Sequence, residues 1–213
     1  MTASDLSDPA LRTALKLPAA APGQRIGLFG GSFDPPHEGH LMVSLSAIRR
    51  LGLDQLWWLV TPGNPLKEHA PGALARRVAA ARGMAAGEPR IRITAIEAAL
   101  GTRYTAKTLD IIRRRRPGVR FVWIMGADNL VQFHRWRQWR EIARSMPIAV
   151  FDRPGSTYPA TTSAAATALR RYRIDEADAA TLARRPPPAW CVLHGRRMAL
   201  SSSALRAASR RPS

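Results

Sequence analysis

The sequence has one cysteine, few acidic residues and no long apolar run, and each shortage excludes a class of protein. Its single cysteine, Cys191, cannot form an internal disulfide, so a disulfide-stapled secreted domain is excluded and the cytoplasm is the simplest location. No stretch approaches the about 20 uninterrupted apolar residues of a membrane-spanning helix, and the N-terminus lacks a charged-then-apolar signal pattern. We therefore expect neither membrane insertion nor export.

The shortage of acidic residues leaves the chain strongly basic. It has 15 aspartates and glutamates against 33 lysines and arginines, a formal net charge of +18 at pH 7, and no acidic residue from Ala179 to Ser213. Basic surfaces bind nucleic-acid phosphates without sequence preference, so a nucleic-acid-binding protein is one interpretation. The arginines occur in pairs and are not interleaved with aromatic residues along one stripe. A solvated surface or an arginine bias from high GC content explains most of them equally well, and we expect no specific nucleic-acid partner.

Two common phosphate-binding motifs, GxxxxGK[ST] and GxGxxG, are absent, and a different one lies at residues 25–41, RIGLFGGSFDPPHEGHL. Its apolar start runs directly into Gly30 and Gly31, as a buried parallel strand does when it ends in a loop with unusual backbone angles. After two prolines, a helical pattern begins at about His37. The free amides and the positive dipole end of that helix point back toward the glycines, where a phosphate would bind.

Two histidines near the start of this helix, His37 and His40, lie one turn apart and can both reach that anion. Two other interpretations stay open. The pair could ligate zinc, although no third ligand cluster accompanies it and Cys191 is far away in sequence. The segment could also be a purely structural turn.

The rest of the chain alternates apolar strand patterns with helical ones and contains no internal repeat, which predicts an α/β fold with a parallel sheet. We expect residues 1–24 to be a poorly ordered extension, dispensable for activity, and 25–213 to form a single domain. Beyond the first strand, strands are predicted at 55–60, 90–94, 119–125, 148–151 and 190–194, and helices at 37–51, 73–86, 106–116 (with Thr105 as N-cap) and 164–172.

Three further segments carry candidate binding residues. Lys67 follows the strand at 55–60 and is either a phosphate contact or a solvated loop lysine. The crowded aromatics and cations at 133–140 are either a core-facing helix with extended arginines or a site that stacks on a heterocycle. Serines ahead of Arg206 are either a second anion site at a helix N-terminus or an ordinary capped helix.

At these residues the sequence resembles a known family. GGSFDPPHEGH is similar to the signature of the (H/T)xGH nucleotidyltransferases. Tyr-Thr before a helix, Gly-Ala-Asp after a strand and a tryptophan shortly afterwards together resemble the bacterial nicotinate-mononucleotide adenylyltransferases. The phosphopantetheine branch of the superfamily shares chiefly the glycine-histidine motif. The stretch 200–206, LSSSALR, is similar to the family's ISSTxxR-type triphosphate motif.

The resemblance implies a Rossmann-like doubly wound parallel sheet flanked by helices, of the nucleotidyltransferase type. It implies transfer of the adenylyl group of ATP to nicotinate mononucleotide, giving deamido-NAD. Mg²⁺ would accompany ATP, with no metal site on the protein. The oligomeric state is not indicated by the resemblance. The runners-up are a nicotinamide-mononucleotide or phosphopantetheine adenylyltransferase and, outside enzymes, the basic nucleic-acid-binding protein. The implied catalytic residues are His37 and His40. The implied ATP-binding residues are Gly30, Gly31, Ser32, Phe33, His37, His40, Lys67, Gly126, Asp128, Ser202, Ser203 and Arg206, and the acceptor-binding residues are Tyr104, Thr105 and Trp136.

Overall fold

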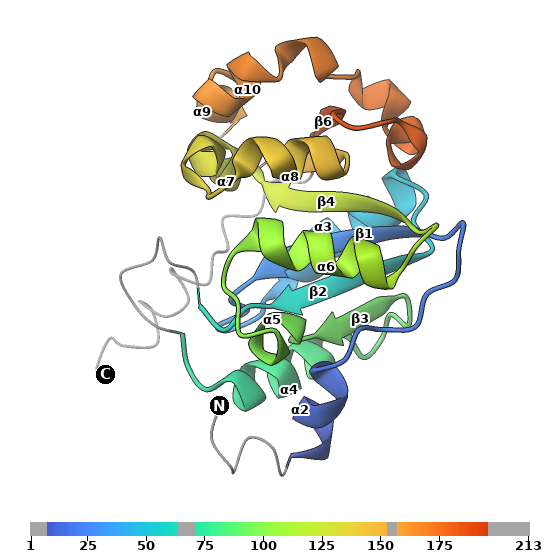
Figure 1. Ribbon diagram of the computed structural model, residues 1–213, viewed down its shortest axis with the longest axis vertical. Coiled ribbons are helices and arrows are strands. Elements are labelled where there is room, and N and C mark those ends of the chain that lie inside the picture. Colours follow the sequence, from blue (N-terminus) through green and yellow to red (C-terminus); the bar gives the residue numbers. More distant parts are fainter. Residues whose placement is uncertain (1–7, 64–70, 153–156, 196–213) are drawn as a thin grey trace.

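A computed structural model describes residues 8–63, 71–152 and 157–195 of the chain. Within these residues six strands form a sheet in the order β3-β2-β1-β4-β5-β6, and every neighbouring pair is parallel (Figure 1). The predicted doubly wound parallel sheet is therefore confirmed. The strands are β1 (Arg25–Gly31), β2 (Gln55–Val60), β3 (Ile91–Thr94), β4 (Arg120–Gly126), β5 (Ile148–Phe151) and β6 (Trp190–Leu193).

The order of the strands defines where a ligand would bind. From β1 the chain adds β2 and then β3 on one side, and after returning to β4 it adds β5 and β6 on the other. The direction of winding thus reverses between β1 and β4. In doubly wound sheets ligands bind outside the carboxyl ends of the strands at such a reversal, so the loops after β1 and β4 border the expected crevice.

Helices cover both faces of the sheet. In Figure 1, α6 and α8 lie in front of it and α3 lies behind. No described helix is long and apolar enough to cross a membrane. The α-helices are α2 (Pro9–Ala14), α3 (Glu38–Arg50), α4 (Leu74–Ala85), α5 (Ile96–Ala99), α6 (Thr105–Arg115), α7 (Ala127–Gln132), α8 (Trp139–Ser145), α9 (Thr157–Thr161) and α10 (Ala164–Ala168), and the 3-10 helices are η1 (Phe133–Arg135), η2 (Arg170–Tyr172) and η3 (Glu176–Arg184).

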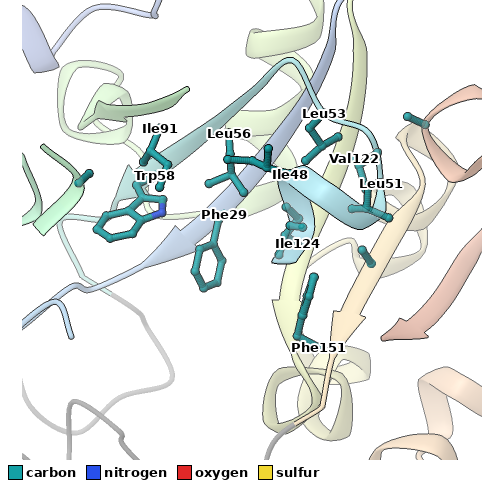
Figure 2. Close-up of a cluster of buried hydrophobic side chains, with 14 of the residues drawn as sticks. Phe29, Ile48, Leu51, Leu53, Leu56, Trp58, Ile91, Val122, Ile124 and Phe151 are labelled. Carbon is teal, nitrogen blue, oxygen red and sulfur yellow. The ribbon is translucent and has the colours of Figure 1, made fainter. Parts of the chain in front are cut away.

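The side chains of each strand point alternately to the two faces of the sheet, and helices cover both faces, so the strands other than β3, in which Arg92 is exposed, are largely buried on both sides. Phe29 and Trp58 belong to the cluster that packs under α3 and α4, which Figure 2 shows, whereas Leu28 and Trp57 belong to the cluster under α6 and α8. Strands of this kind have an almost continuous apolar sequence. For this reason the bounds of β2 and β5 could be predicted correctly from their apolar runs.

The helix boundaries differ in detail from the prediction, and α3 and α4 are each one residue shorter at both ends. Helix α6 begins at Thr105 itself, and Tyr104, whose side chain makes no cap hydrogen bond, is the N-cap. The helix predicted at 164–172 is divided into α10 and the 3-10 helix η2.

The segment from Asp8 to Gln24 differs from the expected poorly ordered extension. Asp8 caps α2 by accepting the amides of Ala10 and Leu11, and Leu11 is fully buried against the sheet side that holds α4. The Thr94 hydroxyl and the Ala95 amide at the end of β3 both donate to the carbonyl of Ala14, at 3.0 and 2.7 Å. Burial of α2 and hydrogen bonds to β3 therefore fix this segment on the domain.

Candidate active site

The loop after β1 lies beside the loop after β2. The Thr61 amide donates to the carbonyl of Gly31 at 3.0 Å, which continues the ladder between the two strands into their loops. On the opposite side β1 pairs with β4, where a Cβ atom on Gly30 would lie 2.7 Å from the Trp123 ring. Only glycine at position 30 lets this ring pack directly on the strand, so Gly30 is required by a close approach rather than by its backbone angle.

Phe33 lies in a strained part of this loop. Its φ is 47°, in the left-handed region that large side chains rarely adopt, and its side chain is fully buried. The ring stacks on Trp58 with centroids 4.7 Å apart and meets Phe29 edge-on at 5.9 Å. Aromatic packing therefore holds a backbone conformation that would otherwise be unfavourable, and strain of this kind is concentrated at functional sites.

The two histidines meet at the start of α3. His37 is the N-cap, His40 is in the first turn, and their ring centroids are 3.8 Å apart. The backbone amide of His37 donates to Nδ1 of His40 at 3.2 Å. Because Nδ1 accepts this bond, the proton of a neutral His40 ring resides on Nε2, which can donate to an anion.

His40 is held in place by Phe33 and by two residues that the sequence patterns did not single out, Ser44 and Trp58. The Ser44 hydroxyl donates to the His40 carbonyl at 2.7 Å, and the Trp58 indole N–H donates to the Ser44 hydroxyl at 2.8 Å. The Phe33 ring packs on the His40 ring with centroids 4.8 Å apart. Ser44 lies four residues after His40, a spacing that could have indicated the contact, but nothing in the sequence pairs Trp58 with it.

The predicted acceptor-binding pair is at the N-terminus of α6. Tyr104 is 40% exposed, Thr105 is half-buried, and the Arg137 guanidinium lies 4.9 Å from the centre of the Tyr104 ring. The first amides of a helix have no acceptor within it, so they can receive an anion. The pair therefore presents N–H groups, a hydroxyl and an aromatic face at one helix end.

A buried carboxyl group lies against the same helix. Glu97 in α5 accepts a 3.0 Å hydrogen bond from the Thr108 hydroxyl of α6, and burial raises the pKa of Glu97 to about 7, although the Thr108 bond opposes this. Thr108 in turn follows Tyr104 by one helical turn, and its amide donates to the Tyr104 carbonyl at 3.1 Å. Glu97 thus connects α5 to the beginning of α6.

Trp136 follows the 3-10 helix η1 and is half-buried. Its ring meets Phe133 at 5.5 Å and Trp123 at 6.4 Å between centroids, both nearly perpendicular. Through Trp123 it is connected to the wall of the Gly30 loop. The crowded segment is thus a 3-10 turn followed by the short α8, in which Trp139 is buried and the Arg140 guanidinium lies 4.5 Å from the centre of the Trp139 ring.

The remaining predicted residues are placed only in part. Gly126 ends β4 beside the crevice, and Asp128 is exposed in the first turn of α7. In the described parts of the chain, no three His, Cys, Asp or Glu side chains gather to hold a metal ion. Four predicted phosphate contacts lie outside the described residues: Lys67, Ser202, Ser203 and Arg206.

Comparison with known proteins shows which family the chain belongs to. Residues 28–208 match the cytidylyltransferase-like family model. The chain is 59% identical to a Bradyrhizobium protein and 60% identical to one from Methylorubrum extorquens, each named "Probable nicotinate-nucleotide adenylyltransferase". Both matches cover 85% of this chain and 95% or 98% of the relative.

A solved structure shares the fold. It is the Plasmodium falciparum nicotinic acid mononucleotide adenylyltransferase complexed with NaAD, with a TM-score of 0.64 and 15% sequence identity over 86% of this chain and 83% of the other. At that identity the likeness concerns the fold. The sequence matches decide the family: the chain belongs to the cytidylyltransferase-like family and, within it, to the nicotinate-nucleotide adenylyltransferases.

Proposed function

We propose that the protein transfers the adenylyl group of ATP to nicotinate mononucleotide, giving deamido-NAD and pyrophosphate. The observation that carries the proposal is the pair His37 and His40 at the start of α3, beside a glycine loop at the point where the winding of the sheet reverses. Relatives that cover most of the chain carry the name of this activity.

The reaction exchanges one phosphoanhydride bond for another. An oxygen of the acceptor's 5′-phosphate forms a bond to the α-phosphorus of ATP, the bond from that phosphorus to the bridging β-oxygen breaks, and pyrophosphate leaves with the electron pair. The attacking phosphate is already an anion at neutral pH, so the enzyme needs neither a general base nor a covalent nucleophile. Catalysis is then mainly positioning and stabilisation of developing charge.

His40 is suited to stabilising the charge that develops on the α-phosphate. With Nδ1 occupied by the His37 amide, its Nε2–H can donate to an α-phosphate oxygen. The bond to His37, the Ser44 hydroxyl and the Phe33 ring fix its orientation before substrate binds. A donor fixed in this way costs no reorganisation when charge develops.

ATP enters this scheme as its Mg²⁺ complex. Mg²⁺ keeps several waters and binds nucleotide phosphates with few protein ligands, which agrees with phosphates as its principal ligands here. We assign the β- and γ-phosphates to Lys67, Ser202, Ser203 and Arg206, on the basis of the motifs that contain them.

The acceptor is assigned to the part of the site at the N-terminal end of α6. The nicotinate carboxylate would be received by the first amides of α6 and the Thr105 hydroxyl, and the pyridine ring would stack on Trp136. Both features are on the carboxyl side of the sheet. The C-terminal end of α6 leads into the beginning of β4, so the N-terminal end of α6 lies toward the opposite, carboxyl edge, and Trp136 follows the carboxyl end of β4. We further propose that the protein acts in the cytoplasm and needs no nucleic-acid partner.

The test is pyrophosphate release from ATP and Mg²⁺ with nicotinate mononucleotide, nicotinamide mononucleotide or phosphopantetheine as acceptor, with the adenylylated product identified by mass. We expect the nicotinate form to give the highest turnover. Pyrophosphate release with phosphopantetheine alone would contradict the assigned acceptor. Steeply salt-dependent binding to arbitrary DNA duplexes, with no pyrophosphate release from any acceptor, would instead favour a nucleic-acid-binding protein.

A further inference from the structure

A buried arginine lies beneath the two loops that border the histidines. Arg77, in the first turn of α4, is only 2% exposed. Its Nη1 donates to the carbonyls of Ser32 at 2.7 Å and Thr61 at 2.8 Å, and its Nε donates to the carbonyl of Gly72 at 2.7 Å. These carbonyls come from the loop after β1, the loop after β2 and the residues before α4, so one side chain connects three segments.

The charge on Arg77 is retained despite its burial. Desolvation lowers the pKa of Arg77 and the nearby Asp34 carboxylate opposes that shift, but a guanidinium stays protonated at neutral pH. A buried cation is costly unless hydrogen bonds replace its water, and bonds from an ionised donor are the stronger kind. The three carbonyls supply this compensation, so the loops and the guanidinium hold one another in a single arrangement.

This arrangement fixes the direction of a backbone amide. The Ser32–Phe33 peptide is trans, since the cis bonds of the described chain are Asp34–Pro35 and Pro187–Pro188. In a trans peptide the C=O and N–H point in opposite directions. Because the Ser32 carbonyl points at Arg77, the Phe33 N–H points away from it.

A second contact ties the same segments together. The amide of Gly72 donates to the Asp34 carboxylate at 2.9 Å, whereas the carbonyl of Gly72 accepts from Arg77. The β1 loop therefore accepts two hydrogen bonds from the start of α4 and the residues before it, at the Ser32 carbonyl and the Asp34 carboxylate, and Phe33 retains its unusual φ of 47° between these two ties.

We infer that Arg77 is a positioning residue for adenylyl transfer, which holds the loops after β1 and β2 in the arrangement that the reaction requires. The inference rests on the proposed function. This positioning role needs the planar guanidinium of arginine, because the single ammonium group of lysine cannot reach all the acceptors that Nε and Nη1 contact separately. Arg77 itself is beneath the loops and acts on substrate only through them.

Arg77→Lys is the principal test, and Arg76→Lys is its matched control. Arg76 is the preceding residue of α4, carries the same side chain and is 74% exposed. We expect Arg77→Lys to lower kcat about tenfold to a hundredfold, since small displacements of positioned groups cost this much, while KM for ATP and acceptor changes far less. Arg76→Lys should keep wild-type kcat. An Arg77→Lys protein that unfolds more easily yet retains wild-type kcat would overturn the inference, because a merely structural role predicts that result.

Hydrogen exchange tests the loop without relying on activity. In substrate-free protein, the backbone amides of residues 26–34 should exchange faster in Arg77→Lys than in wild type, and their exchange should be unchanged in Arg76→Lys. Unchanged exchange in both variants would overturn the inference. If the wild-type protein showed no adenylyl transfer, the proposed function would be wrong. The exchange result would still decide whether Arg77 holds the loop.

Chemical rescue gives a third readout. Low millimolar guanidinium, well below denaturing concentrations, should restore part of the lost kcat in Arg77→Ala by occupying the vacated position between the carbonyls. It should not raise the kcat of Arg76→Ala. If Arg77→Ala does not fold, the lysine variant decides the question alone.

Discussion

Replacing Gly30 with alanine adds one methyl group at the most crowded point of the glycine loop. The new Cβ would lie 2.7 Å from Cη2 and 3.3 Å from Cζ2 of Trp123. The first distance is shorter than the contacts that Cβ atoms make in real structures. Trp123 is only 3% exposed, so its ring has no free space to move into. Either β1 or the indole must move.

The size of the effect follows from this geometry. Overpacking a closely packed core by one methyl group costs about 1–3 kcal/mol in the free energy of unfolding. For a chain of this length that corresponds to a fall in Tm of about 2–4 °C for each kcal/mol. Because Trp123 contacts Trp136, a displaced indole should also raise the acceptor KM.

Urea unfolding and steady-state kinetics would measure both effects, with Gly83→Ala as the control. A Cβ on Gly83, inside α4, meets nothing within 4 Å, and alanine in a helix interior is favoured over glycine by about 0.5–1 kcal/mol. The control should therefore be neutral or more stable than wild type. Equal stabilities for Gly30→Ala and wild type would refute the argument that the Trp123 contact requires glycine.

Three further predictions concern other parts of the site and fold. His40→Ala should lower kcat by about a hundredfold or more while the far-ultraviolet circular dichroism stays native, since one fixed charge-stabilising donor is lost; near-normal turnover would remove His40 from the mechanism. Glu97 has a raised folded pKa of about 7, so the stability it contributes is present below about pH 4.5 and is lost as pH rises through 7. Glu97→Gln should therefore gain about 1–3 kcal/mol over wild type at pH 8 in urea unfolding and much less at pH 5, whereas a pH-independent difference would contradict the shift. Leu11→Ala should cost about 2–5 kcal/mol of stability with kcat unchanged below its Tm, and full stability would mean that α2 does not pack on the domain.

The sheet could be predicted from the sequence because most of its strands are buried on both faces. Such strands are apolar after their first residue, as in β2 and β4, and are bounded by glycine, proline or polar residues. The position of the candidate site followed from the same signals, since the Gly30-Gly31 turn and the helix after Pro36 occur together in sequence. Motifs whose parts lie within one loop and one helical turn can be found without knowing the fold.

Contacts between distant segments could not be predicted in this way. Arg77 is one of 33 basic residues, and only the fold shows that its side chain is buried under two loops. The bond between Trp58 and Ser44 depends on how α3 lies across β2, and the left-handed backbone of Phe33 depends on that packing. The proline- and alanine-rich residues before β1 carry weak helix signals, and their order depends on burial of Leu11 against the sheet.

The most direct test of the account compares kcat/KM for nicotinate mononucleotide and nicotinamide mononucleotide in the same adenylyl-transfer assay. The two acceptors differ in a carboxylate against a neutral carboxamide, and the N-terminus of α6 favours the anion. Charge-assisted bonds of about 1.5–3 kcal/mol each predict a preference of about a hundredfold or more for the nicotinate form. Trp136→Ala should raise KM for both acceptors and leave ATP affinity nearly unchanged, because stacking acts only on the ring. Equal kcat/KM for the two acceptors in the wild-type enzyme would contradict the carboxylate site at Tyr104 and Thr105.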